Sequence, residues 1–299
     1  MAVWVDKFIL PIDKEERIIE NKIYENGGYI DNRYPCDIFS LKGFREVDFS
    51  KITIFYGGNG SGKTTLLNLI ANKLNLIRIS PYNSSDLFDI YVHLCSVRMG
   101  YGDYGEELRV PNGSKIITSD DIFDYMLNVR ENNKDIAQAR VEAMEDCDRR
   151  YYAKTVKLKS MADYEDLRLQ VLARKRSVSK RKFANLLAGE ELRLKSNGET
   201  ALRYFITHLE DDKLYLLDEP ENSLSPKKQL ELVNLIEELS RYCGCQFVIS
   251  THSPFLLSLE GAKIYDLDSS PVDIKKWWEL ENSKTYFDFF YKNKEKFLK

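Results

Sequence analysis

The fold of this chain is decided by residues 57–65, which read Gly57-Gly58-Asn59-Gly60-Ser61-Gly62-Lys63-Thr64-Thr65. The stretch follows the pattern G-x-x-x-x-G-K-[ST], in which the N–H groups of a glycine-rich loop converge on phosphate oxygens. The apolar run 52–56 before it predicts a buried strand, and apolar residues at helical spacing over 64–74 predict a helix after it. The same glycines would suit an ordinary turn before a helix. The complete pattern with both flanks favours a phosphate-binding loop.

The loop also predicts how phosphate and metal are held. Its N–H groups and the positive N-terminal end of the following helix attract an anion. The Lys63 ammonium is expected to reach the β- and γ-phosphates of a nucleotide, and the Thr64 hydroxyl is expected to bind Mg²⁺. The expected nucleotide-binding residues of the loop are Gly57, Asn59, Gly60, Ser61, Gly62, Lys63, Thr64 and Thr65.

Two further apolar strands end in polar residues. Residues 213–217 run into Asp218 and Glu219, and residues 245–250 run into a loop that contains His252. An Asp at the carboxyl end of a buried strand beside a phosphate loop holds Mg²⁺ through water. Glu219 is placed to act as a general base on an attacking water. His252 is expected to contact the γ-phosphate, and a satisfied surface or core histidine is the alternative.

The segment Ser196-Asn197-Gly198-Glu199 stands shortly before the Asp218 strand. Ser196 has Glu199 three residues later, which is a capping box, and apolar residues at helical spacing follow. Taken alone, the segment predicts only a capped helix start.

Together, the segments GGNGSGKTT, KSNGE, LYLLDEPENSLSP and VISTHSP resemble the ATP-binding cassette class of P-loop ATPases. They look closest to the branch with SMC-like and recombination-repair ATPases and small stand-alone predicted ATPases of the AAA type. The resemblance covers roughly residues 40–75 and 190–268. The motifs in this order are specific for the ATPase class and much less specific for a biological role.

The resemblance also implies a role for each motif. The 196–199 segment would be a signature motif that contacts the γ-phosphate held by a second subunit, so that ATP joins two subunits head to tail. The implied assignments are Ser196, Gly198 and Glu199 to the signature, Asp218 to the metal residue, Glu219 to the catalytic glutamate and His252 to the switch histidine. The implied cofactors are ATP and Mg²⁺.

The chain departs from that class in two places. The class has a glutamine loop before its helical subdomain, yet no Gln occurs in residues 1–135, and Asn83 and Asp86 are candidate substitutes. Ser225 stands where the class usually has Asp, which would alter cross-talk between the two sites of a dimer. The segment Leu41-Lys42-Gly43-Phe44-Arg45 resembles an early strand-to-turn segment of the SMC-like branch. In that branch, a basic residue after the aromatic one contacts nucleotide. Arg45 is therefore either a nucleotide contact or a solvated surface arginine.

Composition limits the alternatives. The 299 residues suffice for one large α/β domain with an insertion, or for two lobes. With Lys+Arg 44 against Asp+Glu 47, the net charge of −3 argues against a generic polyanion binder. No apolar run is long enough for a membrane span, and the N-terminus lacks a signal-peptide pattern. Five cysteines without framework spacing suit a reducing cytoplasm, which is the expected location.

The expected fold class is α/β, a P-loop NTPase of ATP-binding cassette type with a β-rich lobe and an inserted helical subdomain. Residues 1–118 are expected to form the N-terminal ATPase lobe, with strands, a charged connection near 13–25 and further strands over 76–118. Residues 119–195 are expected to form the helical insertion, because 119–188 lack Gly and Pro. Residues 196–299 are expected to complete the ATPase lobe.

Two regions outside the motifs suggest contacts. From Arg149 to Lys182 there are twelve Lys/Arg and three Asp/Glu, densest over Arg174–Lys182. Such a face binds nucleic acid, docks an acidic partner protein or is simply solvated. The C-terminal Trp277-Trp278 pair and the aromatic run 286–291 are expected to pack mostly into the core, with an exposed patch as the alternative.

The sequence therefore predicts an ATPase that closes a head-to-tail homodimer on ATP and opens it on hydrolysis. The cycle would act on DNA or control an effector, as in repair or defence systems. A nucleotide-binding subunit of a transporter is one alternative, which the missing glutamine loop argues against. A slow nucleotide-gated scaffold is another.

Overall fold

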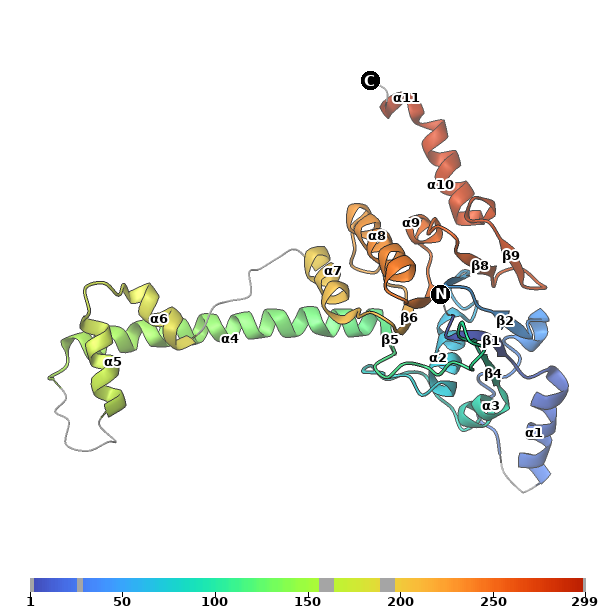
Figure 1. Ribbon diagram of the computed structural model, residues 1–299, viewed down its shortest axis with the longest axis horizontal. Helices are drawn as coiled ribbons and strands as arrows, with labels where there is room; N and C mark the ends of the chain where they lie inside the picture. Colours follow the sequence, from blue (N-terminus) through green and yellow to red (C-terminus); the bar gives the residue numbers. More distant parts are fainter. Residues whose placement is uncertain (1–2, 26–28, 156–163, 189–196, 298–299) are drawn as a thin grey trace. The chain divides into compact units, whose positions relative to one another are not determined.

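The computed structural model describes residues 3–25, 29–155, 164–188 and 197–297. The chain divides into two compact units (Figure 1): Met1–Ile122 with Asn197–Lys299, and Phe123–Ser196. The first unit is thus made from two separate stretches of sequence. The expected division into 1–118, 119–195 and 196–299 stays a prediction.

The larger sheet of the first unit has six strands in the order β5-β6-β7-β3-β8-β9. Neighbouring strands are parallel except at β9, which is antiparallel to β8. The strands are β3 (Ile52–Tyr56), β5 (Lys115–Thr118), β6 (Leu214–Asp218), β7 (Gln246–Ser250), β8 (Lys263–Asp266) and β9 (Asp273–Lys275). Every residue of β3, β6 and β7 is buried, which accounts for their continuous apolar runs. The expected α/β class is confirmed.

A smaller antiparallel sheet supplies the β-rich lobe. Its order is β2-β1-β4, with β1 at Val5–Ile9, β2 at Glu46–Asp48 and β4 at Ser96–Met99. Its buried Phe8 and Val47 belong to the same apolar cluster as Leu66 and Leu67 of α2 (Lys63–Lys73) and Phe55 of β3. One core therefore joins both sheets around the helix that follows the phosphate loop.

One expectation for the N-terminal lobe was wrong. The charged segment near 13–25 is not a connection but helix α1 (Asp13–Glu25), whose acidic first turn suits a helix N-terminus. Its Glu16 is buried and accepts hydrogen bonds from Asp37 N, Ser40 Oγ and Tyr91 Oη. The 76–118 region holds the expected strands β4 and β5, and it also contains a helix.

That region includes helix α3 (Phe88–Leu94), because Phe88 and Tyr91, three residues apart, both turn into the core. Tyr91 also meets the buried carboxylate of α1, so the two helices that the sequence reading missed are linked to each other.

The remaining helices of the first unit follow the signature and metal motifs. They are α7 (Asn197–His208), α8 (Pro226–Tyr242), α9 (Pro254–Leu257), α10 (Glu281–Lys292) and α11 (Lys294–Phe297), with short 3₁₀ turns at Ser40–Lys42 and Trp277–Glu279. α8 packs on α7, α9 and β7. In Figure 1, α7, α8 and α9 form one group of helices that is separate from α2 and α3.

The regular secondary structure in the described residues of the second unit is all helix. α4 (Ser119–Tyr152) begins in the first unit, and α5 (Tyr164–Arg174) and α6 (Lys180–Ala188) follow. Cys147, Ala173 and Phe183 form a small buried cluster among the three helices. None of the described helices is long and apolar enough to cross a membrane.

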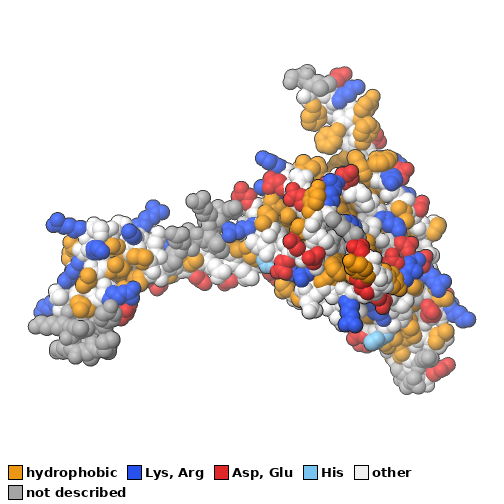
Figure 2. Space-filling model, in the orientation of Figure 1, with side chains coloured by type: hydrophobic (Ala, Val, Ile, Leu, Met, Phe, Trp, Pro, Cys, Tyr) orange, Lys and Arg blue, Asp and Glu red, His pale blue; other side chains and the backbone are white. Residues whose placement is uncertain are grey.

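The expectation that the C-terminal aromatic residues pack into the core was wrong. Trp278 is 57% exposed, Phe287 66%, Phe289 60% and Tyr291 59%. In Figure 2, hydrophobic side chains cover the surface of α10. The sequence reading failed because an aromatic run gives no period that separates a buried helix face from an exposed one.

Candidate active site

The candidate site lies where three neighbouring strands end at one edge of the large sheet. β3 runs into the phosphate loop, β6 ends at Asp218, and β7 ends one residue before Thr251. Asp218 and Ser250 lie opposite each other in the β6–β7 register. The Thr64 hydroxyl donates to Asp218 Oδ1 at 3.1 Å, and the Ser250 hydroxyl donates to the same oxygen. Segments about 150 residues apart in sequence thus meet at one carboxylate.

The phosphate loop has the conformation its glycines allow. Gly60 and Gly62 have φ values of 81° and 102°, which side-chain-bearing residues rarely adopt. A Cβ on Gly62 would lie 2.9 Å from Ile38 Cγ2, so this position requires glycine in space as well. The loop leads directly into the N-terminus of α2 at Lys63, and the Ser61 hydroxyl is buried without a partner among the described residues. Loop, helix end and unpartnered hydroxyl fit a phosphate group.

The Lys63 ammonium, 5% exposed, is the centre of the site. Its Nζ donates to Gly57 O at 2.9 Å and to Gly58 O at 3.2 Å. It lies 2.9 Å from His252 Nε2 and 3.8 Å from Glu219 Oε1. Burial lowers the pKa of Lys63, while the nearby carboxylates, Glu219 first, oppose that shift. A buried cation beside a histidine and a carboxylate is suited to a polyanionic ligand.

Glu219 is held in an unusual backbone conformation, with φ at 47°. Its N–H donates to Ser250 O at 3.0 Å and to Ser250 Oγ at 3.1 Å, which fixes the turn after β6. Its Oε1 lies 3.2 Å from His252 Nε2, and its side chain is 30% exposed. The carboxylate therefore faces the lysine and the histidine while remaining accessible to water.

Asp218 is 8% exposed, and burial raises its pKa, while hydrogen bonds from Ser250 and Thr64 oppose that shift. Within residues 3–25, 29–155, 164–188 and 197–297, no group of three His, Cys, Asp or Glu side chains is placed to hold a metal ion. One carboxylate and one hydroxyl suit Mg²⁺, which keeps several waters and takes further oxygens from substrate phosphates. The residues present therefore fit Mg²⁺ in company with a nucleotide.

We expect the Mg²⁺-dependent increase in ATP affinity to be lost as the pH is lowered. The loss should begin at a higher pH than it would if the metal residue were an Asp with an ordinary pKa. The reason is that the raised pKa of Asp218 lets protons compete with the metal. Measuring ATP affinity with Mg²⁺ and with a chelator across the acidic range tests this. In the isosteric Asp218→Asn variant, the increase in ATP affinity that Mg²⁺ causes should be about 10- to 100-fold smaller than in the parent. This increase should also no longer change with pH across the acidic range. A Mg²⁺ effect that persists unchanged in Asp218→Asn would contradict the assignment.

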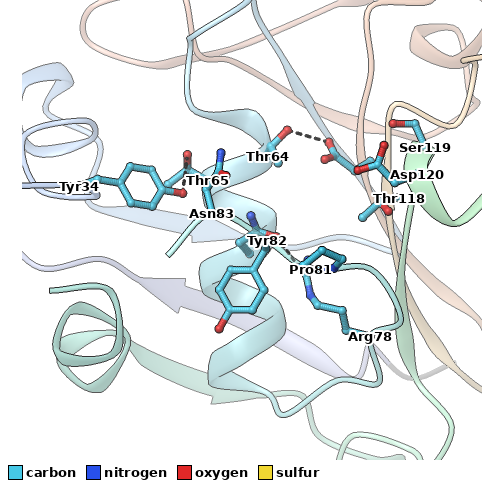
Figure 3. Close-up of a pocket in the computed structure, with 12 residues that line it drawn as sticks. Tyr34, Thr64, Thr65, Arg78, Pro81, Tyr82, Asn83, Thr118, Ser119 and Asp120 are labelled. Carbon is cyan, nitrogen blue, oxygen red and sulfur yellow. Dashed lines mark hydrogen bonds between the residues drawn. The ribbon is translucent and has the colours of Figure 1, made fainter. Parts of the chain in front are cut away.

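The structure separates the remaining predicted residues. Asn83 lines a cavity of about 410 Å³ that Thr64, Arg78 and Asp218 also line (Figure 3). Asp86 instead lines another hollow of the surface. Of the two candidates for the glutamine loop, only Asn83 lines the same cavity as Thr64 and Asp218, the predicted metal residues.

The same cavity is bordered by Thr118, Ser119 and Asp120, where β5 passes into α4 (Figure 3). Thr118 pairs with Asp218 in the sheet, so this turn lies beside the predicted metal residue. The sequence reading missed these residues because nothing in the sequence showed which strand neighbours β6.

The signature segment is described only in part. Ser196 lies outside the described residues, and α7 begins at Asn197. Gly198 lies against the loop after the Glu219 turn, since a Cβ there would be 3.4 Å from Ser223 O. Ser225, which replaces the expected Asp, precedes α8 as its N-cap residue. The trans-acting role of Ser196, Gly198 and Glu199 stays a prediction.

Arg45 is exposed, and its carbonyl accepts a hydrogen bond from Leu10 N. Lys42, three residues earlier, reaches the phosphate loop instead: its Nζ donates to Ser61 O at 2.8 Å and to Leu267 O at 2.7 Å. Asp268 accepts from Gly58 N at 2.6 Å. The sequence reading missed Lys42 and Asp268, although Lys42 stands in the segment that suggested a basic contact. A nucleotide contact by Arg45 stays a prediction.

Fold and site together define a P-loop ATPase of the ATP-binding cassette type, as the motifs indicated. A family model described as AAA domain, putative AbiEii toxin, Type IV TA system matches residues 109–258. The matched stretch covers half of the chain, and the chain belongs to this family. No curated protein matches it.

Several solved structures are similar to the chain at low identity. The SMC head domain from Thermotoga maritima is 13% identical, with 92% of this chain and 99% of that chain covered and a TM-score of 0.36. An Smc head domain with an extended coiled coil, bound to a ScpA domain derived from Pyrococcus furiosus, is 15% identical, with 93% and 98% covered and a TM-score of 0.42. A dimeric ATP-binding cassette bound to ADP and phosphate is 16% identical, with 78% and 88% covered and a TM-score of 0.36.

Proposed function

We propose that this chain binds ATP with Mg²⁺ and hydrolyses it to ADP and phosphate. The observation that carries the proposal is the convergence of Lys63, His252 and Glu219 beside the phosphate loop, with separations of 2.9, 3.2 and 3.8 Å between their charged or ring atoms. These side chains follow three different strands of one sheet. Family membership supports the same activity.

In this scheme, each residue acts on a separate part of the reaction. The loop amides and Lys63 hold the β- and γ-phosphates, and Thr64 and Asp218 are the residues that would hold Mg²⁺, which neutralises charge on the phosphates. Glu219 accepts a proton from the attacking water as the new phosphorus–oxygen bond forms and the bond to ADP breaks. His252 contacts the γ-phosphate in this scheme, and its closeness to Lys63 and Glu219 supports that role.

The direct test is a single-turnover assay with radiolabelled ATP and excess protein. We expect Mg²⁺-dependent release of labelled phosphate that a chelator abolishes. Tight ATP binding without phosphate release would favour the slow nucleotide-gated scaffold. Absence of both would reject the proposal.

We propose further that ATP joins two copies head to tail, with Ser196, Gly198 and Glu199 of one copy completing the site of the other. Gly198 and the loop after Glu219 lie together in one copy, so a single surface would present both. Sedimentation with and without ATP–Mg²⁺ tests this, and a monomer under both conditions would contradict it.

For the biological role, we propose a cytoplasmic ATPase that controls an effector or acts on DNA in a defence setting. The family description names a putative toxin of a type IV toxin–antitoxin system, which supports this setting over repair. Purification with a membrane protein would favour the transporter subunit instead.

The basic stretch Arg174–Lys182 is proposed to carry the macromolecular partner. Two of its residues have structural contacts in the second unit: Arg174 donates to Tyr151 O and Thr155 Oγ1, and Lys180 pairs with Asp148. The other four basic residues are exposed, Lys175 and Arg176 in the turn between α5 and α6 and Arg181 and Lys182 on α6. These four are the residues available for a partner.

We therefore expect replacement of Lys175, Arg176, Arg181 and Lys182 by Glu to leave basal ATPase activity unchanged and to weaken the partner. If the partner is nucleic acid, the slope of log affinity against log salt should fall by up to about 4, because each phosphate contact contributes about one. A variant with Lys284, Lys292, Lys294 and Lys296 changed to Glu makes the same charge change elsewhere and serves as the control.

If the parent protein shows no salt-sensitive binding to DNA or RNA, with or without ATP, nucleic acid is excluded as the partner. The basic stretch would then bind a protein effector or be a solvated face. Loss of ATPase activity in the folded variant would show that the stretch serves the catalytic site.

A further inference from the structure

Glu221, two residues after the proposed base, is a carboxylate to which the scheme above gives no role. Its Oε1 accepts hydrogen bonds from three consecutive residues of the loop after β7. The donors are Thr251 Oγ1 at 2.7 Å, His252 N at 2.7 Å and Ser253 N at 3.1 Å. One oxygen thus holds the backbone on both sides of the proposed γ-phosphate histidine. The contact joins segments 30 to 32 residues apart in sequence.

The other end of Glu221 is built into the turn that carries the base. Asn222 N donates to Glu219 O at 3.1 Å, and Leu224 N donates to Glu221 O at 2.9 Å. Glu219 and Ser223 have positive φ values of 47° and 71°, so this turn depends on its surroundings to keep its shape. Glu221 therefore ties a strained turn to the histidine loop.

The charge of Glu221 has few other partners. Its Oε2 is buried and has no hydrogen-bond partner among the described residues. Burial raises the pKa of Glu221, and hydrogen bonds from Thr251 and His252 oppose that shift. A buried carboxylate with one oxygen unpartnered adds little stability by itself. Its three donors give it a geometric effect, which is to fix where His252 stands relative to Glu219.

We propose that Glu221 is a positioning residue that holds His252 at the distance from Glu219 that hydrolysis requires. Through it, a movement of the turn at 219–225 is transmitted to the histidine. The inference rests on the proposed function, because it assigns Glu221 a part in that reaction. Glu221 itself does not touch the substrate.

The kinetic test compares Glu221→Ala with the conservative Glu221→Gln and with the isosteric Thr251→Val. We expect Glu221→Ala to lower kcat by about 10- to 100-fold, as for other residues that orient a reacting group, with ATP affinity within about threefold of the parent. Glu221→Gln keeps an acceptor oxygen and should recover most of the rate. Thr251→Val removes one donor and should give an intermediate loss. The matched control is Glu237→Ala. Glu237 lies on α8, and its carboxylate accepts a hydrogen bond from Glu260 N at 3.0 Å.

A double-mutant cycle shows whether Glu221 acts through His252. In a His252→Ala background, Glu221→Ala should have almost no further effect on kcat. Full additivity of the two losses would overturn the proposal, as would an unchanged kcat in Glu221→Ala. Equal loss in the Ala and Gln variants would also overturn it.

Amide hydrogen exchange separates this inference from the proposed function, because it needs no hydrolysis. The His252 and Ser253 amides should exchange faster in Glu221→Ala than in the parent and in Glu221→Gln. If the parent shows no ATPase activity, the proposed function fails. The exchange rates would still show whether Glu221 holds the His252 and Ser253 amides. Unchanged exchange at both amides would overturn the positioning role even in an active enzyme.

Discussion

Lys63→Ala should weaken ATP binding by at least about 100-fold, because a charge-assisted contact to phosphate contributes about 1.5–3 kcal/mol and Lys63 is expected to contact two phosphates. The side chain is almost fully buried, and its Nζ lies 2.9 Å from His252 Nε2 and 3.8 Å from Glu219 Oε1. Titration of the variant with a fluorescent ATP analogue, at fixed Mg²⁺ and salt, measures the loss. Circular dichroism must show that the variant is folded.

Lys73→Ala is the control for this change. Lys73 lies at the other end of α2, where its Nζ donates to Val92 O at 3.1 Å and to His93 O at 3.2 Å. It should bind ATP as the parent does. Unchanged affinity in folded Lys63→Ala would show that nucleotide does not bind at this loop.

Glu219→Gln should slow hydrolysis by about 10²- to 10⁴-fold and leave ATP binding intact, because the amide cannot accept the proton from water. The change keeps the size of the side chain and the neighbouring Asp218, which holds its hydrogen bond from Thr64. The chemical step should be measured in single turnover. If ATP joins two copies, this variant should accumulate as a dimer with ATP–Mg²⁺.

The matched substitution Glu231→Gln, on the surface of α8 beside Lys228, should leave the rate unchanged. A Glu219→Gln variant that hydrolyses at the parental rate would exclude Glu219 as the base. If Glu219→Gln hydrolyses slowly but remains monomeric with ATP, the result would support Glu219 as the base. It would contradict only the proposal that ATP joins two copies head to tail.

The sequence by itself determined the phosphate loop and the class of the fold. Conformation at Gly60 and Gly62 depends on local steric freedom, and the buried strands β3, β6 and β7 are marked by continuous apolar runs. Such signals depend on residues close together in the chain, so a single sequence carries them. The helical character of 119–188 was indicated in the same way, by the absence of Gly and Pro.

Tertiary structure alone decided which residues stand beside the loop. Lys42, the last residue of the 3₁₀ helix, reaches Ser61 O, whereas Arg45, which follows the turn at Gly43, is exposed. Glu221 meets His252 because β6 and β7 are neighbours in the sheet. The exposed aromatic side chains of α10 likewise depend on where the chain runs after β9. Each depends on contacts between distant segments, which local periodicity does not encode.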